Sequence, residues 1–136
     1  MATEIELAWA AGFYDGEGSS LCSIKYRYPK NRTGKYANIQ IAVDQNNLDN
    51  LHRFRDAMGG IGSITQFRGR CSRWLVSNFE DCQKVKDLLW PYLGKEKRDQ
   101  FERTFERKRD WKNIEPESRK GPRAAFRSME AFEKLL

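Results

Sequence analysis

Two carboxylates and three glycines share the segment AAGFYDGEGSS, residues 10–20, and no Lys or Arg precedes it. Apolar residues at helical spacing lead into the segment and a strand-like run follows it, so Asp15 and Glu17 are expected at the end of a helix. A carboxylate at the tip of a tightly packed helix is costly unless it binds a positive group. Hard oxygen ligands select Mg²⁺ or a similar ion, which bridges to phosphate. The segment is therefore a candidate metal site.

Small residues recur through the same stretch. Ala8, Gly12 and Gly16 follow one another at four-residue spacing and would lie along one helix face. The absence of a Cβ at the glycines lets two helix backbones approach closely. Ordinary packing against the core of the same chain is the alternative interpretation, and the spacing alone leaves both open.

The basic charge is concentrated in separate places. The formal net charge is +6, which favours a polyanionic partner, nucleic acid first and an acidic membrane surface second. A basic domain without such a partner is the alternative. Residues 1–24 hold no Lys or Arg, whereas residues 25–36 hold no acid. The two basic clusters without an adjacent acid are Lys25, Arg27, Lys30, Arg32 and Lys35, and then Arg68, Arg70 and Arg73.

The cysteine pattern and the length of the apolar runs indicate the compartment in which the protein is expected. Cys22, Cys71 and Cys82 are an odd number without a CxxC pair, which argues against a disulfide framework or a zinc site and favours a reducing, intracellular compartment. The acidic N-terminus does not resemble a signal peptide. The apolar runs are too short to cross a membrane, so no membrane partner is expected.

The chain alternates between helical and strand-like stretches. Thr3 and Glu6 form a T-x-x-E capping box, which predicts a helix that begins there and ends at Gly16 and Gly18. Asn47 is typical of a second helix N-cap. The other predicted elements are strands at 20–28 and 38–43, a helix reaching 58, a hairpin over 61–67 and 73–78, helices at 79–90 and 95–112, a linker at 115–122 and a short helix at 123–136.

This order, α-β-β-α-β-β-α-α, predicts an α+β fold in which helices cover one face of a four-stranded antiparallel sheet. The other face would carry Lys25, Arg27, Asn38 and Gln40 side by side. Arg and Lys suit guanine edges and phosphates, and Asn and Gln suit adenine edges, so this face is a candidate DNA-binding surface. The alternative is that these residues form only the solvent-exposed face of an antiparallel sheet, which is polar by default.

The stretch WAAGFYDGEGS, residues 9–19, resembles the motif of the LAGLIDADG homing endonucleases, with Ala10 in place of the usual Leu and Tyr14 in place of an aliphatic residue. The resemblance extends to V-D-Q at residues 43–45, to G-I-G at 60–62 and to LWPYLGKEKRDQ at 89–100. It covers about residues 4–110. It implies the αββαββα fold with a saddle-like sheet, as one domain over residues 1–112 followed by a linker and short helix at 113–136.

The resemblance also implies roles for individual residues. Glu17 and the Gly16 carbonyl would bind Mg²⁺, or another divalent cation such as Mn²⁺ or Ca²⁺, and no small-molecule cofactor is implied. Gln45 would orient waters at the scissile phosphate. Lys97, with Gln100 in K-x-x-Q, would activate the water or stabilise the transition state, and Lys95 and Arg98 compete for that role. The residues assigned to DNA contact are Lys25, Arg27, Arg32, Lys35, Asn38, Gln40, Arg68, Arg70 and Arg73.

A single motif supplies one carboxylate, whereas two-metal hydrolysis of a phosphodiester needs a pair. The resemblance therefore implies a homodimer joined along Ala8, Gly12 and Gly16, which cleaves both strands of a pseudo-palindromic double-stranded DNA target. A relative that binds nucleic acid without cleaving it, such as an intron RNA maturase or a DNA-binding regulator, is the main alternative. A small interaction domain that dimerises through its first helix is a third.

Overall fold

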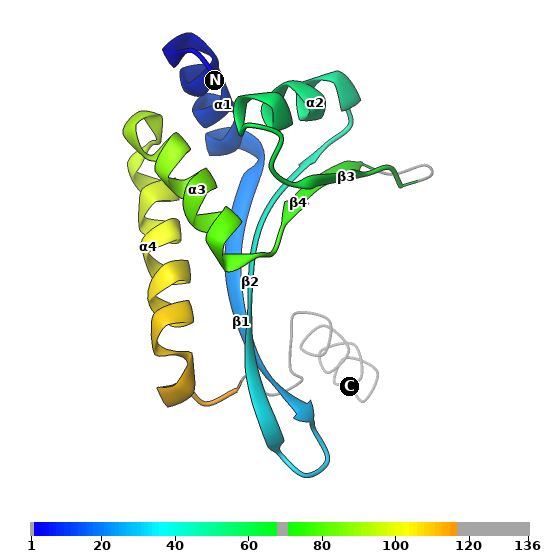
Figure 1. Ribbon diagram of the computed structural model, residues 1–136, viewed down its shortest axis with the longest axis vertical. Coiled ribbons are helices and arrows are strands. Elements are labelled where there is room, and N and C mark those ends of the chain that lie inside the picture. The colour runs from blue at the N-terminus through cyan, green and yellow to red at the C-terminus, as the bar shows by residue number, and fades with distance from the viewer. Residues whose placement is uncertain (1, 68–70, 117–136) are drawn as a thin grey trace, which may run out of the picture.

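The computed structural model describes residues 2–67 and 71–116, and over these residues it confirms the α+β order expected from the sequence (Figure 1). The predicted helix at 123–136 lies outside the described residues. The elements are α1 (Glu4–Glu17), β1 (Gly18–Tyr28), β2 (Thr33–Gln45), α2 (Leu48–Ala57), β3 (Ser63–Thr65), β4 (Ser72–Val76), α3 (Phe79–Leu89), a 3-10 turn η1 (Trp90–Tyr92), α4 (Lys95–Asp110) and a 3-10 turn η2 (Trp111–Asn113).

Local capping sets the length of α1. The Thr3 hydroxyl oxygen accepts a hydrogen bond from the Glu6 N–H at 3.1 Å, as the capping box predicts. The Glu6 carboxylate does not complete the box; it pairs with Arg53 of α2 at 2.8 Å. The helix continues through Gly16, and the Gly18 N–H caps it by donating to the Tyr14 carbonyl. The glycine that ends the helix is therefore Gly18 alone.

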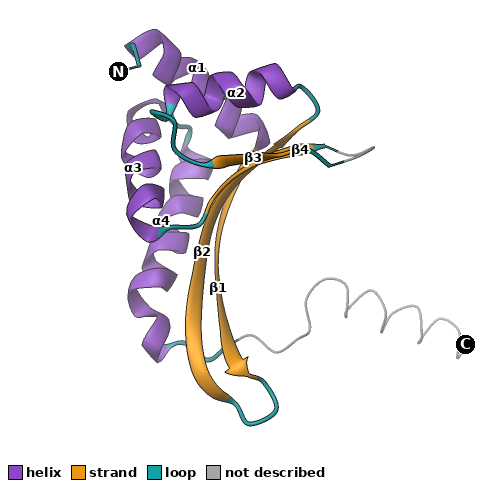
Figure 2. Ribbon diagram, turned by 45° about the vertical axis from the view of Figure 1, so that its right-hand side comes forward, coloured by secondary structure: helices purple, strands orange, loops and turns teal. Residues whose placement is uncertain are grey.

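One antiparallel sheet holds the four strands in the order β1-β2-β4-β3. Its long ribbon, β1 with β2, is longer at both strands than the sequence predicts, because pairing continues from Gly18 opposite Val43 to Tyr28 opposite Thr33. The ribbon bows, and its concave side faces away from the helices (Figure 2). The sheet therefore has one covered face and one face that no described helix covers.

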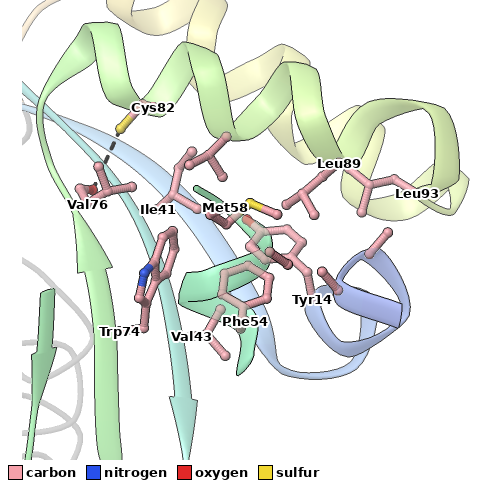
Figure 3. Packing of buried hydrophobic residues seen from close by; sticks show 14 of the residues in the cluster. Tyr14, Ile41, Val43, Phe54, Met58, Trp74, Val76, Cys82, Leu89 and Leu93 are labelled. Carbon is pink, nitrogen blue, oxygen red and sulfur yellow. Dashed lines mark hydrogen bonds between the residues drawn. The ribbon is translucent and has the colours of Figure 1, made fainter. Parts of the chain in front are cut away.

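Alternation along the strands builds the core against the helices (Figure 3). Ile41 and Val43 of β2 are fully buried on the covered face, as predicted. The Phe54 ring meets the Trp74 ring edge to face at 4.8 Å between centroids, and the Tyr14 ring stacks on Phe101 at 5.2 Å. Such aromatic pairs stabilise a core beyond the area they bury. They hold α1, α2 and α4 at fixed positions behind the sheet.

Candidate active site and nucleic-acid interface

Lys97 reaches the end of α1 although it is far from α1 in the sequence. Glu17 is the last residue of α1 and is exposed. Lys97 lies in the first turn of α4, and its ammonium donates a hydrogen bond of 2.6 Å to the Gly18 carbonyl. The ammonium is therefore held at the residue that follows Glu17 in the chain. An exposed acid followed by a residue that holds a cation can serve a site for a phosphate.

The competitors of Lys97 are engaged elsewhere. Lys95 forms an ion pair of 2.6 Å with Asp99 on the same helix. The Arg98 guanidinium donates to the Trp90 carbonyl at 3.0 Å. Lys97 is thus the member of this basic run that the structure directs to the end of α1.

Gln45 lies at the same end of the sheet. It is the last residue of β2, two residues beyond Val43, which is opposite Gly18. Its side-chain oxygen accepts hydrogen bonds from the backbone N–H groups of Asn46 at 2.8 Å and Asn47 at 3.3 Å. Because this oxygen is engaged by the loop to α2, contact with a water or a phosphate would fall to the amide nitrogen.

Side chains of α4 attach the helix to the outer edge of β1, which is an edge strand. They meet alternate residues of β1, whose backbone groups point away from β2. The contacts are Lys97 to the Gly18 carbonyl, the Gln100 oxygen to the Ser20 N–H at 3.2 Å, Thr104 to the Ser20 hydroxyl at 3.0 Å, and Arg107 to the Cys22 carbonyl at 3.0 Å. This contact fixes Lys97 relative to β1.

Asp15 has a role that the sequence analysis missed. Its carboxylate accepts the Gly94 N–H at 3.1 and 3.2 Å, and Gly94 is the N-cap residue of α4. A negative charge at a helix N-terminus is favourable. The two acids of the motif therefore differ in role: Asp15 fixes the start of α4, and hence Lys97, whereas Glu17 remains exposed. No local signal reveals this contact, because Gly94 is 79 residues away in the chain.

The stripe of small residues does not pack against the described part of its own chain. Ala8, Gly12 and Gly16 are all exposed. A Cβ built on either glycine meets no other described atom within 4 Å outside the local backbone. Ile5, one turn before Ala8 on the same side of α1, is 79% exposed. Packing against the core of the same chain therefore does not explain these glycines over the described residues.

The uncovered face carries the polar and cationic residues that strand alternation predicts. Lys25 and Arg27 of β1 are exposed. Asn38 and Gln40 of β2 lie on the same face, because Asn38 is opposite Ser23 and Gln40 is opposite Leu21. Figure 2 shows no described helix over this face. The four side chains are available to a partner that follows the ribbon.

Two basic residues lie differently from the expectation. Lys35 has the same strand parity as Ile39, which puts it on the covered face, and its ammonium donates to the carbonyls of Lys112 and Ile114 at 2.8 Å each. Arg73 is on the uncovered face, but Asp44 on the neighbouring strand pairs with it at 2.6 Å. The expectation that Arg73 belongs to a cluster without an acid is therefore wrong.

The other basic candidates are placed as follows. Arg32 is exposed in the turn between β1 and β2, with a left-handed φ of 51°. Arg68 and Arg70 lie outside the described residues.

A family model described as LAGLIDADG endonuclease matches residues 10–105 of this chain. The chain belongs to the LAGLIDADG endonuclease family. Three solved structures show the same fold. The intron-encoded homing endonuclease I-CeuI with DNA has a TM-score of 0.67 and 18% identity over 83% of this chain and 58% of that one. I-LtrWI with its target DNA has a TM-score of 0.66 and 22% identity over 80% of this chain and 38% of that one, and I-CvuI with the I-CreI target has a TM-score of 0.59 and 22% identity over 67% and 58%.

This LAGLIDADG chain spans less than two thirds of each of those proteins. No curated protein sequence matches it significantly. The order of elements and the antiparallel sheet agree with the family fold that the motif implied.

The described part of the LAGLIDADG chain offers few clustered metal ligands. No group of three or more His, Cys, Asp or Glu side chains able to hold a metal occurs among residues 2–67 and 71–116. The exposed Glu17 carboxylate and the Gly16 carbonyl are hard oxygen donors of the type that Mg²⁺ and Ca²⁺ prefer. No helix in the described part of the chain is both long and apolar enough to span a bilayer.

The last glycine of the LAGLIDADG motif has a testable packing role. A Cβ on Gly18 would overlap the ring of Tyr14, which is fully buried. Replacing Gly18 with alanine is expected to destabilise the chain by about 1–3 kcal/mol through overpacking. Urea denaturation measures this loss, and Ser19→Ala, at the exposed next position of β1, is the matched control. Equal midpoints for the two variants would contradict the packing role.

Proposed function

We propose that this chain is a site-specific DNA endonuclease that acts as a homodimer and hydrolyses both strands of double-stranded DNA with divalent cations. The observation that carries the proposal is the Lys97 ammonium held on the Gly18 carbonyl, beside the exposed Glu17. This pair lies at the end of a bowed sheet face that no described helix covers and that presents Lys25 and Arg27.

The β1–β2 ribbon has the length to follow a duplex over about one helical turn. A two-stranded ribbon fits the major groove of B-DNA. β1 has 11 residues, and a strand advances about 3.3 Å per residue, close to the roughly 3.4 Å per base pair of DNA. One chain is therefore expected to cover a half-site of about ten base pairs, with the site of cleavage at its inner end.

The exposed face of α1 supports the homodimer. Backbones of two α1 helices can approach closely along Ala8, Gly12 and Gly16, because no side chain among residues 2–67 and 71–116 fills the space beside the two glycines. Packing of this kind brings the two Glu17 residues near the two-fold axis. A symmetric dimer reads matching half-sites, so the target is expected to be pseudo-palindromic.

The residues present fit divalent-cation chemistry. Glu17 and the Gly16 carbonyl would hold the cation, which lowers the pKa of a bound water and polarises the phosphate. The Lys97 ammonium supplies a fixed positive charge for the negative charge that develops on the phosphate. I-CvuI has been solved with its target in 2 mM Ca, and with the uncleaved I-CreI target in 2 mM Mg, which supports the use of divalent cations here.

Selection from a randomised duplex library, scored for both binding and cleavage in Mg²⁺, tests the proposal. We expect one pseudo-palindromic sequence of about 20 base pairs to be bound and cut on both strands. Binding without cleavage at any cation concentration would support a DNA-binding regulator instead. Failure to select any DNA, with tight binding to structured RNA, would support a maturase.

A further inference from the structure

Asp44 and Arg73 form a pair on the uncovered face of the sheet. The two residues are directly opposite each other on β2 and β4. The Arg73 Nε donates to Asp44 Oδ1 at 2.6 Å, and Nη2 donates to Oδ2 at 3.0 Å. The hydrogen bonds from Arg73 lower the pKa of Asp44, so both groups are charged at neutral pH. The pair is preformed in the protein without DNA.

The geometry of the pair leaves one edge of the guanidinium for another ligand. A guanidinium has five N–H donors in a planar fork. Asp44 uses the side formed by Nε and Nη2. The opposite end, formed by Nη1 and the second hydrogen of Nη2, presents two parallel donors, which is the pattern that matches the O6 and N7 acceptors of guanine. The Arg73 side chain is 44% exposed on the uncovered face.

An acid on a DNA-binding face would by itself weaken binding, because DNA phosphates repel it. Asp44 faces the same side as Asn38 and Gln40, since all three share strand parity. Arg73 balances the charge of Asp44. Asp44 in turn holds the long arginine side chain in place, so that Arg73 loses less conformational entropy when DNA binds. The fixed orientation suits an acceptor that takes two parallel hydrogen bonds. On the concave face of a ribbon that would enter the major groove, that acceptor is expected to be a base edge rather than a backbone phosphate.

The position of the pair locates the base pair it would meet. Val43 is opposite Gly18, the residue after Glu17, so Asp44 lies at the end of the ribbon where cleavage is proposed. The base pair would lie at the inner end of each half-site, a few base pairs from the two-fold axis.

On the basis of the proposed DNA-cleaving function, we propose that Arg73 reads a guanine in the major groove near the centre of the target, and that Asp44 is the positioning residue that holds Arg73 for this contact. In the homodimer the contact occurs twice, so the selected target carries this guanine once in each half-site.

Comparison of Asp44→Asn and Arg73→Gln with the unaltered chain tests this inference. Each protein is passed through the randomised duplex library, and its affinity for the selected target is measured at several salt concentrations. Arg73→Gln is expected to lose the guanine preference at one position per half-site, with about a 10- to 100-fold loss of discrimination there. Asp44→Asn is expected to weaken the same preference while it raises affinity for unrelated DNA, because a negative charge is removed.

Base preferences at the other positions are expected to be unchanged in both variants. Thermal denaturation of both variants checks that they fold, and both side chains are half-exposed. The inference is overturned if Arg73→Gln weakens binding equally to all sequences and makes the affinity depend less steeply on salt concentration, since that result identifies a phosphate contact. It is also overturned if Asp44→Asn leaves the guanine preference intact, or if the selected target has no guanine that depends on Arg73. If the unaltered chain selects no DNA at all, the proposed function itself fails.

Discussion

The Glu17→Gln variant is expected to bind its target DNA as tightly as the unaltered chain and to leave both strands intact. The substitution keeps the size of the side chain and removes the charge that would hold the divalent cation. Removing a residue that only supports a metal ligand lowers metal affinity or activity by about 10- to 100-fold. Removing the ligand itself is therefore expected to reduce cleavage by more than about 100-fold. DNA affinity depends instead on the cationic strands, which the change does not touch.

Cleavage of labelled duplex in Mg²⁺, with binding measured in parallel in Ca²⁺, separates the two effects. Glu80→Gln on α3 is the matched control, because Glu80 is exposed and has only a loose pair with Lys84 at 3.8 Å. The control is expected to cut at the normal rate. A Glu17→Gln protein that cuts as fast as this control would falsify the assignment of the active site.

The Gly12→Leu variant is expected to be a folded monomer that no longer cleaves both strands. A Cβ at this position meets no described atom within 4 Å outside the local helix backbone, and Gly12 is exposed, so we expect the fold to accept the leucine. Between two close helices the same side chain overpacks, at about 1–3 kcal/mol, and a symmetric interface contains the change twice. The dimer is therefore expected to weaken by about 2–6 kcal/mol, or at least about 30-fold.

Light scattering across a range of protein concentrations measures this dissociation, and far-UV circular dichroism shows whether the monomer is folded. Gly12→Lys gives the same test with a soluble side chain. Gln83→Leu, at an exposed position of α3, controls for an added surface leucine. A stable Gly12→Leu dimer would exclude the helix seam as the interface and leave the exposed glycines without an explanation.

Features that depend on neighbouring residues were predictable from the sequence. The Thr3 and Asn47 caps form as expected, because each side chain bonds an N–H three residues along. The alternation of Ile39, Ile41 and Val43 correctly predicts the covered face of β2. The family resemblance added Glu17 and Lys97, and the Lys97 ammonium binds the carbonyl of the residue that follows Glu17.

Features that depend on pairing between distant segments were not predictable. Asp44 lies opposite Arg73 only because of the strand register, and 29 residues separate them in the chain. Lys35 was expected in a loop near other cations, but β2 begins before it and turns it to the covered face. Likewise, nothing near Asp15 indicates that its partner is the N–H of Gly94.

The attachment of α4 to β1 has a consequence for how the protein could acquire new DNA targets. Three of its contacts are made to main-chain groups of Gly18, Ser20 and Cys22, which do not depend on the side chains of their neighbours. The outward side chains at Leu21, Ser23 and Lys25 take no part in them. Substitutions at those outward positions are therefore expected to change the base preference while Lys97 keeps its contact with β1. Retargeting, by evolution or by design, can proceed on one side of the strand without disturbing the other.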